Sequence, residues 1–298
     1  MNKKFEIFID STGELNREYR EKYDIDYLPM GVSFDDKEIP ASLDYDQGYS
    51  IHDFYQYMRE GKRIFTSQVK ETSFVEKWKP LLEKGLDILY IACSGALSQS
   101  VNAGRVVAER LLADYPDRKI ICFNSKISCC GQADMAIRAS KMREEGKSIE
   151  ETYAWLRENR LKFNQFATVD SLTYLKQAGR VKASSAFFGN LFKVHPILIS
   201  DAKGNNFAIS KIKGKKAAIK ELVRLAVEAA EDIEHQTVYI AHADDPAVAE
   251  EVKAELLSLA KPQEIAIFPF GPIIGASTGP GTIGIFLFGK EVTTNLEA

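Results

Sequence analysis

The sequence predicts an α/β protein of two domains, and three observations lead to this fold class. In the first half, short apolar runs alternate with helical patterns, as at residues 88–93 and 97–113. The apolar runs are continuous, as expected for strands covered on both faces. Around residues 157–165 the chain becomes polar and the order of elements changes. We therefore predict a mostly parallel open sheet flanked by helices in residues 1–162, then a mixed-sheet α/β sandwich in residues 163–298.

In the first domain, each predicted strand is an apolar run and each predicted helix is an amphipathic stretch. The expected strands are residues 5–9, 25–34 (interrupted by Pro29), 88–93 and 119–123. The expected helices are residues 51–60, 73–83, 97–113, 128–145 and 148–160.

The second domain begins with a strand at 166–169 and a helix at 172–176. A short helix is expected at 183–192, and a hairpin of 196–199 with 206–212, because residues 201–205 carry a strong turn signal. The remaining expected elements are helices at 215–231 and 245–259 and strands at 237–241, 263–268 and 282–288. This order indicates a mixed sheet with helices on one face.

Composition excludes several classes of function. A net charge of −3 argues against nucleic acid as the main partner, because phosphate binding normally needs a clustered basic surface. The four cysteines form no Cys-x-x-Cys pair and the four histidines are scattered, so neither a disulfide framework nor a metal site is expected. The first residues show no apolar signal region, and no apolar run approaches the length of a membrane span, which makes the cytoplasm the expected location.

Hydroxyl-bearing residues follow the predicted strands of the first domain. In parallel sheets, ligands bind beyond the carboxyl ends of the strands, and these residues gather there. An alternative is that each group only caps a helix, since Ser, Thr, Asp and Asn are favoured at that position. The groups after strands are Asp10-Ser11-Thr12, Ser94-Gly95 with Ser98 and Ser100, and Asn124-Ser125 with Ser128, and a loop before a helix carries Thr66-Ser67-Gln68.

Residues 271–286 combine glycine, proline and hydroxyl residues and then enter an apolar run. Glycine lets a backbone approach a ligand closely, and Ser277 and Thr278 supply hydroxyls that can donate and accept hydrogen bonds. We expect a loop here that suits a small polar head group at the mouth of an apolar pocket. The alternative is an ordinary turn that leads into the last strand.

The sequence offers many hydroxyls and few acid–base partners. Neither a Walker A motif nor Gly-x-Gly-x-x-Gly is present, and Ser94 lacks the Gly-x-Ser-x-Gly context of a nucleophile elbow. This balance favours binding over catalysis. The alternative is a serine-dependent acyl or ester hydrolase that uses Ser94 or Ser67, with His242 as its base.

Eight motifs, in order along nearly the whole chain, resemble those of the DegV family. They are Asp10-Ser-Thr-Gly-Glu-Leu15, Phe54-Tyr-x-x-Met58-Arg-x-Gly61-Lys62, Thr66-Ser67-Gln68, Cys93-Ser94-Gly95-Ala96-Leu97-Ser98, Asn124-Ser125, Leu172 to Val181, Lys193-Val-His-Pro196-Ile-Leu198, and Gly271-Pro272 with Gly279-Pro280-Gly281.

The resemblance implies a two-domain protein that binds a long-chain fatty acid between its domains and presents it to a separate ATP-binding fatty-acid kinase subunit. It implies no catalysis by this chain and no cofactor. Thr66, Ser67 and Ser94 would hold the carboxylate, and the 275–281 loop would close over it. Arg180 and Lys193 would lie near the partner-facing side or the domain interface. The ligand-binding residues implied in this way are Thr66, Ser67, Ser94, Gly95, Ser98, Gly275, Ser277, Thr278 and Arg180.

One departure from the family pattern concerns Ser277, which stands where the family usually has histidine. Histidine can form a charged pair with a carboxylate, whereas serine forms only a neutral hydrogen bond. The alternative to a kinase-coupled carrier is therefore a lipid-binding protein without kinase coupling.

The acyl tail is expected to dominate affinity. Each buried methylene contributes roughly 0.8 kcal/mol, whereas a neutral hydroxyl contact contributes about 1 kcal/mol net. The candidate lining residues of a tunnel, each of which could also be ordinary core, are Phe187, Phe188, Leu191, Phe192, Ile273, Phe286 and Phe288.

Overall fold

A computed structural model describes residues 3–34, 37–182 and 194–294. The chain forms two compact units. Unit 1 consists of Met1–Gln47 and Phe65–Arg160, and unit 2 consists of Gly48–Ile64 and Leu161–Ala298. The sequence-based division placed the boundary after residue 162 and assigned residues 48–64 to the first domain, whereas the compact units divide after residue 160 and assign that segment to unit 2.

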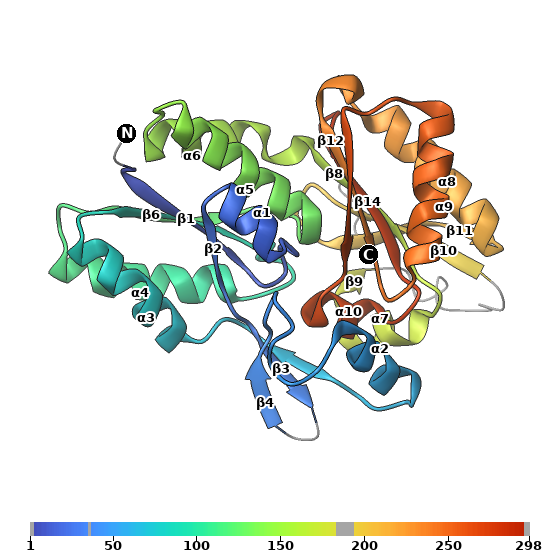
Figure 1. The fold of residues 1–298 in the computed structure, drawn as a ribbon, viewed down its shortest axis with the longest axis horizontal. Coiled ribbons are helices and arrows are strands. Elements are labelled where there is room, and N and C mark those ends of the chain that lie inside the picture. Colours follow the sequence, from blue (N-terminus) through green and yellow to red (C-terminus); the bar gives the residue numbers. More distant parts are fainter. Residues whose placement is uncertain (1–2, 35–36, 183–193, 295–298) are drawn as a thin grey trace. The chain divides into compact units, whose positions relative to one another are not determined.

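The main sheet of unit 1 is fully parallel, with the strand order β2-β1-β6-β7, as predicted. Helices α5 and α6 cover one face of this sheet and α3 and α4 cover the other, while the short helix α1 leads into β2 (Figure 1). The elements are β1 (Phe5–Asp10), α1 (Arg17–Lys22), β2 (Ile25–Leu28), α3 (Glu71–Glu83), β6 (Asp87–Ala92), α4 (Ser100–Asp114), β7 (Ile120–Asn124), α5 (Cys129–Glu144) and α6 (Ile149–Asn159).

A second, antiparallel sheet of unit 1 has the order β4-β3-β5, formed by β3 (Gly31–Phe34), β4 (Lys37–Pro40) and β5 (Phe65–Ser67). The prediction of a single strand over residues 25–34 was wrong. Pro29 has no amide proton to donate to a ladder, and the chain leaves the parallel sheet after Leu28. The amide of Met30 then donates to the Ser11 hydroxyl at 3.0 Å instead of to a strand.

The buried carboxylate of Asp10 joins the carboxyl ends of β1 and β6. One of its oxygens accepts hydrogen bonds from the Thr12 amide and hydroxyl at 3.1 and 2.5 Å. The other accepts from the Tyr90 hydroxyl at 2.9 Å and from the Cys93 amide at 2.8 Å. Two of the four donor groups belong to Thr12, on the loop after β1, and the other two belong to Tyr90 on β6 and to Cys93 directly after it. Asp10 therefore holds the loop after β1 next to the loop after β6, which carries Ser94.

The sheet of unit 2 is mixed, with the order β13-β12-β14-β8-β10-β11-β9, which confirms the predicted class. The predicted hairpin is present as β10 and β11, which pair antiparallel. The strands are β8 (Phe163–Thr168), β9 (Val181–Lys182), β10 (Val194–Ser200), β11 (Asn206–Lys213), β12 (Thr237–His242), β13 (Glu264–Pro269) and β14 (Ile283–Phe288).

Helices lie on both faces of the unit 2 sheet, so the prediction of helices on one face was wrong. Successive strand residues point to opposite faces, and Phe166 packs in the core beneath α8 and α9, whereas Ala167 packs with Leu172 and Leu175 of α7. The helices are α2 (Ile51–Arg59), α7 (Leu172–Ala178), α8 (Lys215–Ala229), α9 (Pro246–Leu259) and α10 (Pro272–Thr278), with single 3₁₀ turns at Arg160–Lys162 and Ile233–His235. The helix predicted at 183–192 lies outside the described residues. In the described part of the chain, every helix is too short or too polar to cross a lipid bilayer.

Replacement of Asp10 tests the role of its carboxylate. Asp10→Ala leaves the Tyr90 hydroxyl and the Cys93 amide without a buried acceptor, so the free energy of unfolding should fall by about 2 to 4 kcal/mol. Asp26→Ala is the matched control, because its ion pair with Lys77 at 2.8 Å is about half exposed and should be worth less than about 1 kcal/mol. Denaturant unfolding followed by circular dichroism measures both. Equal, small losses would contradict this role.

Candidate functional site

Thr66 and Ser67 lie on β5, where they pair with Val32 and Gly31 of β3, so the prediction that they lie on a loop was wrong. The Ser67 hydroxyl donates to Glu38 Oε1 at 2.5 Å, so this serine already binds a carboxylate within unit 1. The Lys70 ammonium lies 3.5 Å from the other carboxylate oxygen. The Ser67 hydrogen bond, with help from the Lys70 charge, lowers the pKa of Glu38 and keeps it ionised.

A short chain of hydrogen bonds links this segment to Ser98. The Val69 amide donates to the Ser100 hydroxyl at 3.1 Å, and the Ser98 and Ser100 hydroxyls lie 2.9 Å apart. The Ser100 amide also donates to the Ser98 hydroxyl at 3.2 Å. The structure therefore brings together two sequence groups, 66–68 and 94–98, that are about thirty residues apart.

Ser94 and Gly95 form a tight turn directly after β6. The Ser94 hydroxyl accepts a hydrogen bond from the Ala96 amide at 3.2 Å, and the Ser94 side chain is fully buried. The Gly95 amide donates to Asn124 Oδ1 at 3.0 Å, at the end of the neighbouring strand β7. A Cβ on Gly95 would lie 2.9 Å from the Asn124 amide nitrogen. Five predicted binding residues thus lie in unit 1, on two segments that the hydrogen bond from Val69 to Ser100 joins.

Gly275, Ser277 and Thr278 lie on α10, so the prediction that residues 275–281 form a loop was wrong for its first four residues. Pro272 stands in the first turn, where its missing amide proton costs nothing, and Gly279 ends the helix with a φ of 83°. The Thr278 hydroxyl donates to the Ile274 carbonyl at 3.0 Å, which uses its single proton inside the helix.

Helix α2 packs on α10 through a close approach at Gly275. A Cβ there would lie 2.5 Å from the Tyr55 hydroxyl oxygen and 2.9 Å from the Phe54 ring. The Tyr55 hydroxyl donates to the Phe270 carbonyl at 2.7 Å. The Asp244 carboxylate also contacts α2 at its exposed side, where His52 Nδ1 lies at 3.0 Å and the Arg59 guanidinium at 2.6 Å. These contacts explain why residues 48–64 belong to unit 2.

Arg180 is exposed just after α7 and donates to the Ala178 carbonyl at 2.6 Å. Gly179 before it adopts a left-handed conformation, with a φ of 64°, that ends the helix. Lys193 lies outside the described residues, as do the candidate tunnel residues Phe187, Phe188, Leu191 and Phe192.

The described candidates for a tunnel lie in packed surroundings. Ile273 is buried. Phe286 meets Phe270 edge to face at a centroid distance of 6.4 Å, and Phe288 meets Phe163 at 5.1 Å. Such pairs contribute to the core of unit 2, and a role in a tunnel stays a prediction.

The residues of the hydrolase alternative are divided between the units. Ser94 belongs to unit 1 and His242 to unit 2, so neither unit by itself holds both members of the predicted pair. Burial lowers the pKa of His242, against an opposing effect of Asp245 and Asp244, and its Nδ1 accepts from the Asp245 amide at 3.2 Å. Within the described structure, no cluster of three or more His, Cys, Asp or Glu side chains could hold a metal ion.

Lys215 lies near the same histidine and joins two carboxylates, Asp170 at 3.0 Å and Asp245 at 3.2 Å. Burial lowers the pKa of Lys215, but the two carboxylates outweigh it and the net shift is upward. Gly281 approaches this group closely, since a Cβ there would lie 2.1 Å from an Asp170 oxygen. The chain after α10 is therefore held against this ion-pair group.

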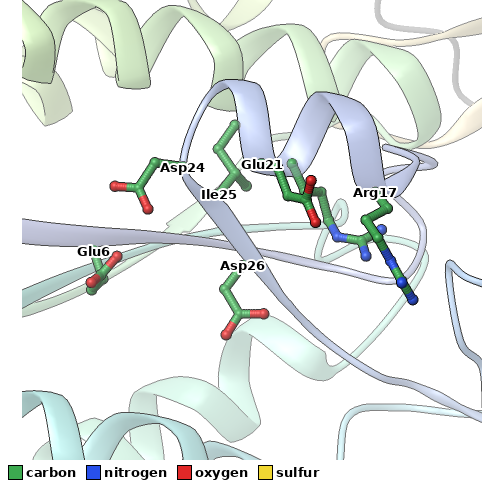
Figure 2. Close-up of a pocket in the computed structure, with 7 residues that line it drawn as sticks. Glu6, Arg17, Glu21, Asp24, Ile25 and Asp26 are labelled. Carbon is green, nitrogen blue, oxygen red and sulfur yellow. The ribbon is translucent and has the colours of Figure 1, made fainter.

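A charged pocket of about 310 Å³ lies elsewhere in unit 1, between α1, β1 and β2 (Figure 2). Three of its four acidic groups form ion pairs with lysines: Lys3 pairs with Glu6 and Asp24, and Lys77 pairs with Asp26. It shares no residue with the predicted binding set, and its charged walls do not suit an acyl chain. The lining residues are Glu6, Arg17, Arg20, Glu21, Asp24, Ile25 and Asp26.

The sequence analysis missed Glu38, Gly31 and Tyr55. Glu38 lies 29 positions before Ser67, and a lone glutamate in a polar stretch gives no local signal of such a contact. The available signal was Gly31 inside a strand pattern, which indicates a close approach of other groups.

Comparison with known proteins gives a consistent result. The model of the DegV family matches residues 4–290. A DegV domain-containing protein of Clostridium perfringens is 35% identical over 288 residues, which cover 96% of this chain and 98% of the relative. A DegV lipid-binding protein of Thermotoga maritima has a TM-score of 0.84 at 28% identity, with 97% of this chain and 99% of that chain covered. A DegV family protein of Thermus thermophilus, described as binding fatty acid, has a TM-score of 0.85 at 26% identity, with coverages of 96% and 100%.

The packing of α2 on α10 can be tested at Gly275. Gly275→Ala places a methyl group against Tyr55 and Phe54, so the free energy of unfolding should fall by about 1 to 3 kcal/mol. Part of this loss should disappear in a Tyr55→Phe background, because the nearest clashing atom is then absent. Ser277→Ala, on the same helix, is the control and should change stability little. A Gly275→Ala variant as stable as the original protein would contradict the close approach.

Proposed function

Because the chain belongs to the DegV family, we propose that it binds a long-chain fatty acid and holds the carboxylate with serine and threonine hydroxyls. The observation that carries the proposal is the group of hydroxyl residues at one edge of unit 1. Thr66 and Ser67 precede Val69, whose amide donates to the Ser100 hydroxyl, and that hydroxyl lies 2.9 Å from the Ser98 hydroxyl. The Ser98 amide in turn donates to the Ser94 carbonyl at 3.0 Å. Solved relatives with the same fold are described as binding lipid or fatty acid, which supports this ligand class.

The chemistry of the edge suits an anionic head group. Ser67 donates a hydrogen bond to the Glu38 carboxylate, so its hydroxyl can serve as a donor to a carboxylate. Serine and threonine hydroxyls bind such a group without a buried counter-charge, and each contributes about 1 kcal/mol net. A tail of about fourteen buried methylenes would contribute roughly 11 kcal/mol before the costs of association. In this proposal the tail sets affinity and the hydroxyls set orientation.

The proposal extends to residues of unit 2. Gly275, Ser277 and Thr278 on α10, and Arg180 after α7, are assigned to the ligand by the family resemblance, as are Gly95 and Ser98 in unit 1. The Ser277 hydroxyl and the Arg180 guanidinium are donors of the right type for a carboxylate or an acyl phosphate, whereas the Thr278 hydroxyl already donates to the Ile274 carbonyl. The position of the ligand between the two domains stays a prediction.

We further propose that the chain is a carrier without catalysis of its own, which presents the carboxylate to a separate ATP-binding fatty-acid kinase subunit. The sequence around Ser94, which lacks the Gly-x-Ser-x-Gly context of a nucleophile elbow, supports a binding role. Ser277, which stands where the family usually has histidine, is the residue that bears on kinase coupling, because serine offers the head group only a neutral hydrogen bond.

Acyl binding can be tested by native mass spectrometry and by calorimetric titration with saturated acids of increasing length. The protein should carry or take up a long-chain acid, with affinity rising about fourfold per methylene until the apolar site is filled. Thr66→Val should weaken binding about fivefold at every length. Thr72→Val, on the exposed side of α3, is the matched control and should have no effect. A protein that stays empty with palmitate and oleate would contradict the proposal.

Kinase coupling can be tested by supplying an ATP-dependent fatty-acid kinase subunit and trapping acyl phosphate with hydroxylamine. The unaltered protein should support a low rate, and Ser277→His should raise it about tenfold, because a protonated imidazole forms a charged hydrogen bond. Ser277→Asn, which stays neutral, should leave the rate unchanged. If Ser277→His forms acyl phosphate at the same rate as the unaltered protein, residue 277 does not limit transfer. If no variant forms acyl phosphate, kinase coupling is contradicted, while the proposal of acyl binding still stands.

A further inference from the structure

Glu38 reaches Ser67 across the strand that separates them. Gly31 on β3 pairs with Pro40 of β4 on one side and with Ser67 of β5 on the other. Glu38 stands two residues before Pro40 and therefore points to the same face of the sheet. Its carboxylate crosses over Gly31 to accept the Ser67 hydrogen bond at 2.5 Å.

The absence of a side chain at residue 31 makes this crossing possible. A Cβ on Gly31 would lie 2.1 Å from Glu38 Oε1 and 2.2 Å from Ser67 Oγ. Gly31 does not have a positive φ, so conformational freedom does not explain a glycine here. The glycine instead leaves the space in which the carboxylate and the hydroxyl meet.

The contact occupies the hydrogen atom that a ligand carboxylate would need. A serine hydroxyl has one proton to donate, and here Glu38 accepts it. Glu38 is also an anion, so a second carboxylate at Ser67 would meet a like charge. Lys70 offsets part of that charge at 3.5 Å, but its own side chain is 60% exposed and its effect is screened by solvent.

We propose that Glu38 competes with the ligand carboxylate for the Ser67 hydroxyl and thereby sets how strongly the site prefers an ionised acid over a neutral head group. The inference rests on the proposed function, since it assumes that Ser67 contacts the head group. An alcohol can donate its own proton to Glu38, whereas an acid anion must displace Glu38 from Ser67. Glu38 therefore lowers the affinity for acids and leaves alcohols little affected.

The test compares oleate with oleyl alcohol by calorimetric titration. Glu38→Ala should tighten oleate binding about tenfold and change oleyl alcohol binding less than about twofold. In a Ser67→Ala background, Glu38→Ala should change oleate affinity less than about twofold, because the hydroxyl for which Glu38 and oleate compete is then absent. Glu76→Ala, an exposed glutamate of α3, controls for net charge and should change neither affinity.

A second variant protects the test against a loss of folding. Glu38→Asp keeps the charge but shortens the side chain by one methylene, which withdraws the carboxylate from Ser67, so it should also tighten oleate binding. Thermal unfolding of each variant checks that the sheet is intact.

Two results would overturn the inference. One is oleate affinity that is the same with and without Glu38. The other is a gain that persists in the Ser67→Ala background, which would assign the effect to the freed Lys70 charge. Failure of the proposed function looks different, because the unaltered protein would then bind neither oleate nor oleyl alcohol, and both proposals would fall.

Discussion

The loop that carries Ser94 in unit 1 depends on one buried carboxylate. Asp10 ends β1, and its two oxygens accept from Thr12 on its own loop and from Tyr90 and Cys93 on β6. A buried carboxylate is tolerated only when its acceptor sites are filled, so the loops around it have little freedom to shift. Ser94 follows Cys93 directly and takes its position from that arrangement. The position of Ser94 is thus set by the hydrogen bonds of a buried carboxylate.

Two glycines place the remaining parts of the candidate site by leaving room for other side chains. Gly31 admits the meeting of Glu38 and Ser67, and Gly275 admits Tyr55. In both cases a polar group fills the space that a Cβ would occupy. The missing side chain of each glycine therefore makes room for a side chain that forms a hydrogen bond: Glu38 with Ser67 at Gly31, and Tyr55 with Phe270 at Gly275.

The sequence predicted those parts of the fold that follow from local pattern. Continuous apolar runs gave the parallel strands, because strands buried on both faces need no alternation. Two of the predictions that were wrong came from local pattern. Pro29 divides one apolar run between two sheets, so residues 25–34 are not a single strand. The glycine-containing segment after Gly271 is helical and not a loop, because Pro272 suits the first turn of a helix. The contact of Ser67 with Glu38 could not be predicted, since it depends on the register of three short strands. The placement of Ser94 and Asn124 at strand ends was predicted, because each ends a continuous apolar run.

The assignment of residues 48–64 to unit 2 means that the backbone passes between the units three times, at residues 47–48, 64–65 and 160–161. Neither unit is a single stretch of sequence. A fragment ending at residue 160 would contain α2 but would lack Asp244 and Gly275, which α2 contacts. The remaining fragment would lack α2, so the surface of α10 at Gly275 would be exposed. Unit 2 thus depends on a segment encoded within unit 1, so the two cannot be separated by one cut or exchanged as independent modules.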